Sequence, residues 1–267
     1  MGRIKIVSAF LFVVLFFTCG CINLPDNTPY DNNLDEISVA CWNLQIFGTT
    51  KANKPDLIEF YGDTLDDYDI FIVQEIRDIS GTAIQILADE FPNHVYILSD
   101  RAGQSSSKEQ YAVFYNNEVE LISYKDWANV YQDEMQRPPF EVTFKSTQGI
   151  WDFTVFTIHT SPSTVSDDLE ITEDIIGSTT QDTILIGDLN ADGNYYNEEN
   201  IQHFETWDWV IHNNVDTTVA SSDNTYDRII INDACENNYL TYGIIDDVTE
   251  EQSDHYLIYG VFNPMVE

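Results

Sequence analysis

The feature that most constrains the fold of this chain is a series of short apolar runs, rich in β-branched and aromatic residues, spaced along its length. Such runs, bounded by polar turn residues, are typical of buried strands. Between some of them, apolar residues recur at helical spacing. This mixture predicts layers, with sheet at the centre and helices outside. The predicted strands are residues 37–42, 70–73, 111–115, 141–144, 153–158, 183–186, 228–231 and 256–262, and the predicted helices are 54–65, 82–90 and 200–209.

The chain is long and apolar enough to fold as one domain after an N-terminal leader. With 267 residues and 43% hydrophobic residues, it can bury one sizeable core and does not have the composition of a disordered protein. Nothing in the pattern requires a second domain. We divide it into an export signal at residues 1–21, a polar tether at 22–36 and a folded domain at 37–263.

The leader has the layout of a secretory signal peptide. A basic start with Arg3 and Lys5 precedes an apolar stretch at residues 6–17, which is short for a membrane span. Cys21 follows a small residue and resembles a lipoprotein processing site, while an ordinary export signal with incidental cysteines is the alternative reading. We therefore expect an extracellular protein, either secreted or tethered to the outer face of the cell membrane through a lipid on Cys21.

The charge of the chain is strongly unbalanced. It has 46 acidic and 11 basic residues, for a formal net charge of −35. One reading is the surface of a halophilic protein, where salt screens the repulsion between carboxylates. The other is an acidic protein that binds cations or basic partners. We favour the halophilic reading, because the acids are spread along the whole chain and lysine is scarce throughout.

Short polar motifs stand at or just after the strand-like runs. Carboxylate and amide oxygens in such places can hold Mg²⁺, which binds a few oxygen ligands and keeps several waters. Asp188 and Asn190, two residues apart on one side of an extended strand end, could also position a water and steady phosphoryl oxygens. Any one of these residues alone could be a strand-end cap. The predicted metal ligands are Asn43, Glu75, Asp254 and Asp188.

Two histidines lie at strand boundaries in the company of acids. Hydrolysis of a phosphodiester needs one group to activate water and another to protonate the departing oxygen. His159 and His255 can do both near neutral pH if each is oriented by a carboxylate, for which Glu109 and Asp227 are the candidates. A lone histidine would more often be structural, so the prediction depends on the pair.

The few basic residues cluster near these motifs. A chain that excludes cations elsewhere but keeps them here suggests a polyanionic substrate. Local pairing with neighbouring acids is the alternative explanation. The predicted substrate contacts are Arg77, Arg137, Lys108, Tyr111 and Arg228.

In their order the motifs resemble the endonuclease/exonuclease/phosphatase superfamily, and within it the deoxyribonuclease I-like members. The resemblance runs from about residue 37 to residue 262 and includes Gln74-Glu75-Ile76-Arg77-Asp78 and Gly187-Asp188-Leu189-Asn190. It implies an α/β (α+β) fold, a four-layer sandwich of two packed, mainly antiparallel β-sheets flanked by helices. It also implies cleavage of DNA with Mg²⁺ or Mn²⁺.

The resemblance also implies roles for individual residues. His159 and His255 would be the acid–base pair, supported by Glu109 and Asp227, with Glu75, Asp254 and Asn43 at the metal. Arg77 and Arg137 would contact the DNA backbone. Structural Ca²⁺ would lie near Asp216, Thr218 and Asp133.

The chain departs from the family pattern where the family grips DNA. Gln45 and Gln110 stand where the family has basic residues, and Ser107 stands where it has a groove-inserting tyrosine. The family's disulfide cysteines are replaced by Gly193 and Asn224. These departures imply intact chemistry with a weakened grip on DNA.

The expected function is therefore that of a monomeric, extracellular, metal-dependent endonuclease with little sequence preference. The nearest alternative keeps the mechanism and acts on RNA, a phospholipid head group or a small phosphoester. A non-catalytic surface lipoprotein that keeps the fold is a further alternative, although none of the expected acid–base or metal residues is missing.

Overall fold

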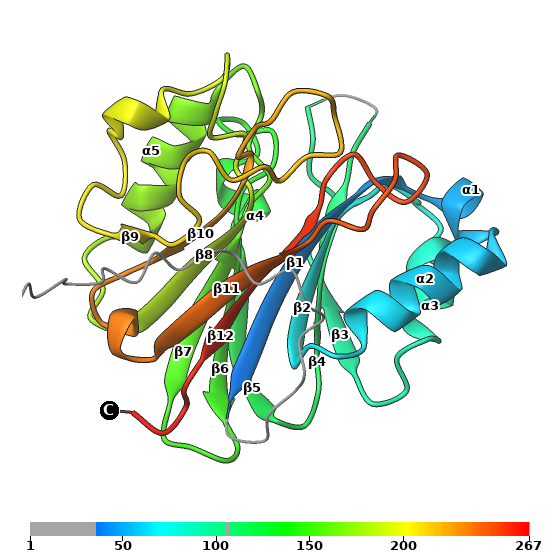
Figure 1. The fold of residues 1–267 in the computed structure, drawn as a ribbon, viewed down its shortest axis with the longest axis horizontal. Coiled ribbons are helices and arrows are strands. Elements are labelled where there is room, and N and C mark those ends of the chain that lie inside the picture. The colour runs from blue at the N-terminus through cyan, green and yellow to red at the C-terminus, as the bar shows by residue number, and fades with distance from the viewer. Residues whose placement is uncertain (1–35, 105–106, 267) are drawn as a thin grey trace, which may run out of the picture.

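The computed structural model describes residues 36–104 and 107–266, which fold around two six-stranded sheets (Figure 1). Each of the eight predicted strands is present, and several extend beyond their predicted bounds. The first sheet has the order β11 (Tyr239–Ile245), β12 (Leu257–Phe262), β1 (Ile37–Phe47), β2 (Ile70–Ile76), β4 (Gln110–Tyr115), β3 (Val95–Leu98). The second has the order β5 (Val119–Asp126), β6 (Phe140–Ser146), β7 (Asp152–Thr157), β8 (Asp182–Asp188), β10 (Asp227–Ile231), β9 (Asp208–Trp209).

Most neighbouring strands run antiparallel, and the central pairs β1–β2 and β7–β8 are parallel. The strands that flank these pairs, β12, β4 and β10, run the opposite way. The last residues of the parallel strands therefore lie at the same edge of the sandwich as the first residues of their antiparallel neighbours. This arrangement brings motifs that are far apart in the sequence to one edge.

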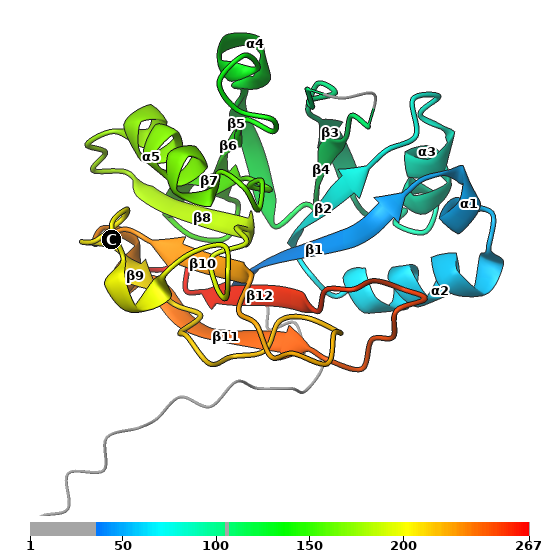
Figure 2. The ribbon, with the colours of Figure 1, turned by 90° about the horizontal axis from the view of Figure 1, so that it is seen from above.

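The two sheets face each other across one apolar core and carry a second and a third core on their outer sides. The inner core contains β-branched and aromatic residues of both sheets, such as Ile72 and Phe153. Outside the first sheet lie α1 (Thr49–Ala52), α2 (Pro55–Leu65) and α3 (Thr82–Ala88), and outside the second lies α5 (Val165–Ile176) (Figure 2). A short α4 (Ala128–Tyr131) and two 3₁₀ turns, Glu198–Asn200 and Cys235–Asn237, complete the described elements. The predicted sandwich of two mainly antiparallel sheets flanked by helices is confirmed.

The helices that cover the first sheet form where the sequence predicts them. In α2, Pro55 stands at the start, where its missing N–H costs nothing and its fixed φ suits a helix. Leu57, Ile58, Tyr61 and Leu65 recur at helical spacing and are buried against the sheet. Burial of this stripe, rather than intrinsic helix propensity, stabilises α2.

The predicted helix at residues 200–209 is wrong. Phe204 has a φ of 54°, which no right-handed helix accommodates, and Trp209 pairs with Ile230 in the sheet. Both side chains still pack into the third core, so the apolar spacing reflects burial of an irregular segment. The helix that covers the second sheet is α5, an acid-rich segment in which the sequence pattern predicted no helix.

The predicted signal peptide, the polar tether up to residue 35 and the lipid-modified Cys21 lie outside the described residues. Within residues 36–104 and 107–266, no helix has the length and hydropathy needed to cross a membrane. Cys41 and Cys235 are both buried, unpaired thiols in the inner core.

Candidate active site

The predicted site residues meet at one edge of the sandwich. Asn43 and Glu75 lie in β1 and β2, the central parallel strands of the first sheet. Asp188 is the last residue of β8 and faces Asp227, the first residue of β10, in direct register. Glu109, His159, Asp254 and His255 lie in loops just before β4, after β7 and before β12. The site therefore forms where the ends of these strands meet at one edge of the sandwich.

Two histidine–carboxylate pairs form the centre of the site. His159 Nδ1 is 2.7 Å from Glu109 Oε1, and His255 Nδ1 is 2.8 Å from Asp227 Oδ2. All four side chains are buried or nearly so. Each carboxylate fixes the orientation of its ring and favours a proton on Nδ1, which leaves Nε2 for chemistry. The pairing predicted from the sequence is present for both histidines.

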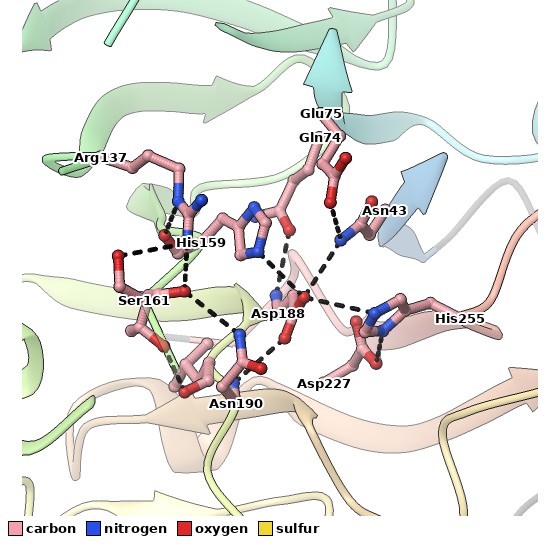
Figure 3. Close-up of polar contacts among 12 residues, drawn as sticks. Asn43, Gln74, Glu75, Arg137, His159, Ser161, Asp188, Asn190, Asp227 and His255 are labelled. Carbon is pink, nitrogen blue, oxygen red and sulfur yellow. Dashed lines mark hydrogen bonds and ion pairs between the residues drawn. The ribbon is translucent and has the colours of Figure 1, made fainter. Parts of the chain in front are cut away.

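Both rings point their Nε2 atoms at the same oxygen (Figure 3). Asp188 Oδ2 lies 3.2 Å from Nε2 of His159 and 3.4 Å from Nε2 of His255. The same oxygen accepts a hydrogen bond of 3.1 Å from Asn43 Nδ2. Asp188 therefore sits between the two pairs and marks the point where a reacting group would meet both rings.

The negative charges of the site act strongly on His255. Burial favours its neutral ring, but Asp227, Asp188 and Asp254 outweigh that effect and raise the pKa of His255 to about 10. Burial likewise opposes ionisation of Asp188, yet the facing His255 and His159 and two hydrogen bonds lower the pKa of its carboxyl group. The raised pKa of His255 and the lowered pKa of Asp188 both favour an imidazolium beside a carboxylate.

Gln74 joins the two sheets behind these residues, a role that was not predicted from the sequence. Its Oε1 accepts the backbone N–H of Asp188 at 3.1 Å, and its Nε2 donates to Thr157 Oγ1 and the Ile158 carbonyl at 3.0 Å each. A Cβ at Gly187 would lie 2.2 Å from the Ile158 carbonyl oxygen and 2.6 Å from Gln74 Nε2. Only glycine at this position therefore allows β8 to approach the Gln74 side chain. The hydrogen bonds of Gln74 fix Asp188 relative to His159.

Two residues of the site have strained backbones. Glu75 and Asn190 have φ values of 61° and 47°, in the left-handed region that non-glycine residues seldom adopt. The strain persists because hydrogen bonds hold both residues: Glu75 Oε2 accepts the N–H of Ile46 at 2.7 Å, and Asn190 Nδ2 donates to the Thr160 carbonyl at 3.2 Å. Such strain is concentrated at functional sites.

The oxygen atoms near Glu75 suit a hard divalent cation. Asp254 Oδ1 is buried and accepts no hydrogen bond from the described residues, although it lies 3.9 Å from His255 Nε2. Glu75 lies next to Asn43, whose Nδ2 is 3.4 Å from Glu75 Oε1 and whose Oδ1 accepts the N–H of Gln45. In this arrangement the Asn43 amide presents its nitrogen to the carboxylates, so binding a cation through Oδ1 requires the amide to turn.

Among the described residues, acidic and histidine side chains gather closely enough to ligate a metal ion in two groups. One comprises Glu75, Glu109 and His159, and the other comprises Asp188, Asp227 and His255. In each group the histidine Nδ1 is already bonded to a carboxylate, so these nitrogens are not free as ligands. The oxygens of Glu75 and Asp188 remain the better candidates.

Of the basic residues predicted to contact substrate, one is exposed and others are already bonded to protein atoms. Lys108 is exposed beside the site. Arg77 Nη2 lies 2.8 Å from Glu75 Oε2 and 3.5 Å from Glu109 Oε2, and its Nη1 donates to Ser107 Oγ. Arg137 Nε donates to the His159 carbonyl at 2.7 Å, and its Nη2 donates to the Thr160 carbonyl. Both arginines therefore brace the site and are only partly exposed.

Tyr111 does not reach the surface of the site. Its ring is 3% exposed, and its hydroxyl accepts the N–H of His159 at 3.0 Å. Burial raises the pKa of this hydroxyl, which stays protonated. The prediction that Tyr111 contacts substrate is corrected to a positioning role beneath His159.

Arg228 does not reach the surface either. Its side chain is fully buried and donates to the carbonyls of Ile211 and Ala191 and to Asn213 Oδ1. Burial lowers the pKa of its guanidinium to about 10, so it remains charged at neutral pH. The predicted substrate contact at Arg228 is corrected to a structural role, in which it ties the loops after β8 and β9 to β10.

The residues implied for structural Ca²⁺ lie in two loops. Asp216 Oδ1 accepts hydrogen bonds from the backbone and hydroxyl of Thr218 and from the N–H of Asn224, which closes its own loop. Asp133 is exposed in the loop after α4. Ca²⁺ binding there stays a prediction from the resemblance.

The two positions where the resemblance implies a disulfide lie against each other. A Cβ at Gly193 would lie 2.9 Å from Asn224 Oδ1. Nearby, Asp192 Oδ2 accepts the N–H of Thr225, and Tyr195 packs on Tyr226 with ring centroids 5.4 Å apart. Hydrogen bonds and aromatic packing therefore hold these loops together.

The model of the endonuclease/exonuclease/phosphatase family matches residues 40–255 of the chain. The chain belongs to this family. The match extends over nearly all of the folded part and contains each of the histidine–carboxylate pairs described above.

Individual relatives agree with this assignment. The chain is 27% identical to deoxyribonuclease-1 of Bos taurus over 253 residues, which covers 82% of this chain and 90% of that protein. Among solved structures, D. rerio TDP2 complexed with a single-strand DNA product superimposes with a TM-score of 0.62 at 14% identity, covering 85% of this chain and 99% of TDP2. A mannosyl-6-phosphatase of Bacteroides thetaiotaomicron gives a TM-score of 0.59 at 17% identity, with coverages of 84% and 98%. These structures share the fold, and the predicted resemblance to deoxyribonuclease I is confirmed.

Proposed function

We propose that this chain hydrolyses phosphodiester bonds of DNA, with little sequence preference and with Mg²⁺ or Mn²⁺. The observation that carries the proposal is the convergence of His159 Nε2 and His255 Nε2 on one oxygen of Asp188, each ring backed by its own carboxylate. Membership of the family and similarity to deoxyribonuclease-1 support DNA as the substrate.

The two histidines divide the proton transfers. One Nε2 accepts a proton from water as the water oxygen attacks phosphorus, and the P–O bond opposite breaks. The other ring, protonated, donates its proton to the departing oxygen. Asp188 and Asn190 hold the water and the phosphoryl oxygens between the rings, while Glu109 and Asp227 stabilise each ring when it carries a positive charge.

The site as described repels a phosphodiester. Five carboxylates, two guanidinium groups and two histidines surround the reaction centre, and both arginines are already paired or bonded to protein oxygens. A bound divalent cation supplies the missing positive charge at the phosphoryl oxygens. Glu75, Asp254 and Asn43, with Asp188 nearby, would hold it; the structural Ca²⁺ implied by the resemblance is a separate site.

We place the enzyme outside the cell, secreted or held at the membrane by a lipid on Cys21, and acting as a monomer. The secretory layout of the leader supports export, and the membrane would be contacted only through that lipid.

The test is cleavage of supercoiled plasmid by the protein from residue 23 onward, in molar salt. We expect nicking with Mg²⁺ and with Mn²⁺ plus Ca²⁺, and its loss on addition of EDTA, because the acidic site cannot accept a phosphate without a cation. Undiminished cleavage in EDTA would refute metal dependence. Absence of cleavage of both plasmid and single-stranded DNA by a folded, metal-supplied protein would refute the assignment of DNA.

The second candidate substrate is a different phosphoester. Gln45, Gln110 and Ser107 leave fewer groups to grip DNA, and Arg77 is engaged by Glu75. The likeness to a mannosyl-6-phosphatase shows that this fold accommodates small phosphoesters. RNA, sphingomyelin and small phosphodiesters therefore belong in the same assay. A non-catalytic role is less well supported, because the acid–base pairs are complete.

Salt should stabilise this protein. A net charge of −35 makes the folded chain repel itself, and in about 1 M salt the Debye length falls to roughly 3 Å, which screens that repulsion. We expect the thermal midpoint to rise from dilute buffer to molar KCl and cleavage to persist. The measurement is a melting curve at each salt concentration beside the plasmid assay. Equal stability and activity in both buffers would contradict the halophilic reading.

A further inference from the structure

A groove of about 650 Å³ opens beside Glu75, between the end of β1 and the loop that follows β2. These two ends lie side by side, with Phe47 paired to Ile76 (Figure 2). The volume falls within the usual range for small-molecule sites. The groove is outside the set of acid–base residues, and the proposed function assigns no part of the substrate to its apolar side chains.

Two exposed isoleucines line this groove. Ile46 is 57% exposed, and Ile79, at 83%, is the most exposed large hydrophobic residue among those described. Ile46 also has a φ of 55°, which is strongly disfavoured for a β-branched residue. Exposed apolar side chains and a strained backbone beside a reaction centre mark a binding surface rather than a fold requirement.

The groove is joined directly to the carboxylate that would hold the metal. The N–H of Ile46 donates to Glu75 Oε2 at 2.7 Å, and Arg77, which also lines the groove, contacts the same oxygen at 2.8 Å. Whatever occupies the groove therefore lies next to the scissile phosphate. An occupant so close belongs to the substrate itself.

The cations of the groove are not available to a second phosphate. Lys51 Nζ donates to the carbonyls of Leu44 and Gln252, and Arg77 is engaged by Glu75 and Ser107. The occupant should thus be an uncharged, largely apolar part of the substrate. In a nucleotide, that part is the base.

We propose that Ile46 and Ile79 form a subsite for an unpaired nucleobase beside the scissile phosphate, so that the enzyme prefers single-stranded to duplex DNA. The inference rests on the proposed function. In a duplex the faces of the bases are stacked on each other, and exposing one costs energy that a single strand does not have to supply. Base faces bind exposed apolar and aromatic surfaces with little regard to sequence.

The test compares cleavage of one oligodeoxynucleotide in three forms: single-stranded, duplex, and single-stranded with abasic sites flanking the scissile bond. The measured quantity is kcat/KM for the base-bearing strand divided by that for the abasic strand. We expect this ratio to fall about five-fold in Ile79→Ser and in Ile46→Ser, through KM, because a modest apolar contact is lost. Ile122→Ser, at a comparably exposed isoleucine of β5, is the matched control and should leave the ratio unchanged.

The possible results distinguish failure of the base subsite from failure of the proposed function. Cleavage of nucleic acid with equal ratios in all variants would refute the base subsite and leave the proposed function intact. Faster cleavage of duplex than of single strand by the unmodified protein would also refute the subsite. No cleavage of any nucleic acid would refute both. Loss of binding to sphingomyelin vesicles in Ile79→Ser, without an effect on DNA, would reassign the groove to a lipid.

Discussion

Replacing His255 or His159 by alanine should lower plasmid cleavage by about 10²–10⁴-fold under conditions where the variant stays folded. Each ring lies between its own carboxylate and Asp188, so its loss removes one proton transfer. The double variant should be little slower than the slower single variant, because residues that act as a unit do not contribute additively. The measurement is the initial rate of nicking at saturating metal and DNA.

The control for these variants is His212→Ala. His212 is exposed and has no place in the site, so its replacement should leave the rate unchanged. Folding of every variant is checked by circular dichroism. Retention of more than about a tenth of the rate by a folded His159→Ala or His255→Ala variant would contradict the acid–base assignment.

Replacing Arg228 by alanine should destabilise the protein by about 3–5 kcal/mol. Its fully buried guanidinium is bonded to the carbonyls of Ile211 and Ala191 and to Asn213. Removal leaves the two buried carbonyls without this donor and opens a cavity among the residues that surround Arg228. The free energy of unfolding is measured by urea titration in molar salt, at constant protein concentration.

The matched control for Arg228 is Lys145→Ala. Lys145 pairs with Asp152 at 3.2 Å, but both side chains are about half exposed, and surface pairs of this kind contribute about 0–1 kcal/mol. A loss in Arg228→Ala no larger than that in Lys145→Ala would contradict the structural role. Cleavage by Arg228→Ala under conditions where it stays folded should be nearly normal, which further separates structure from substrate binding.

The residue types that form the candidate site could be predicted from the sequence. The strand-like runs and the motifs that follow them depend on local patterns, namely period, turn residues and residue type, which can be read without coordinates. The pairing of His159 with Glu109 and of His255 with Asp227 was also predictable, although partly through the resemblance to a family. Helix α2 was predicted within one residue, because Pro55 and an apolar stripe mark it.

Prediction of helices from local patterns failed where a segment is buried by residues that are distant from it in the sequence. Phe204 and Trp209 have the spacing of a helix, yet they fill the third core from an irregular segment. The helix α5 was missed because its many acids mask the helical spacing of its buried residues Val165, Leu169 and Thr172. In both cases the deciding contacts are tertiary, and no single-segment pattern contains them.

Which basic and aromatic residues can reach a substrate depends on tertiary packing and could not be predicted from the sequence. Arg228 and Tyr111 adjoin motif residues in the sequence, but strand alternation turns their side chains into the protein, where hydrogen bonds satisfy them. The bridge through Gln74, the close approach at Gly187 and the groove between Ile46 and Ile79 each join segments from different strands. Residue identity limits the type of chemistry that a site can perform. The exposure of each side chain, the distances between the side chains and the convergence of both histidines on Asp188 depend on how the two sheets pack.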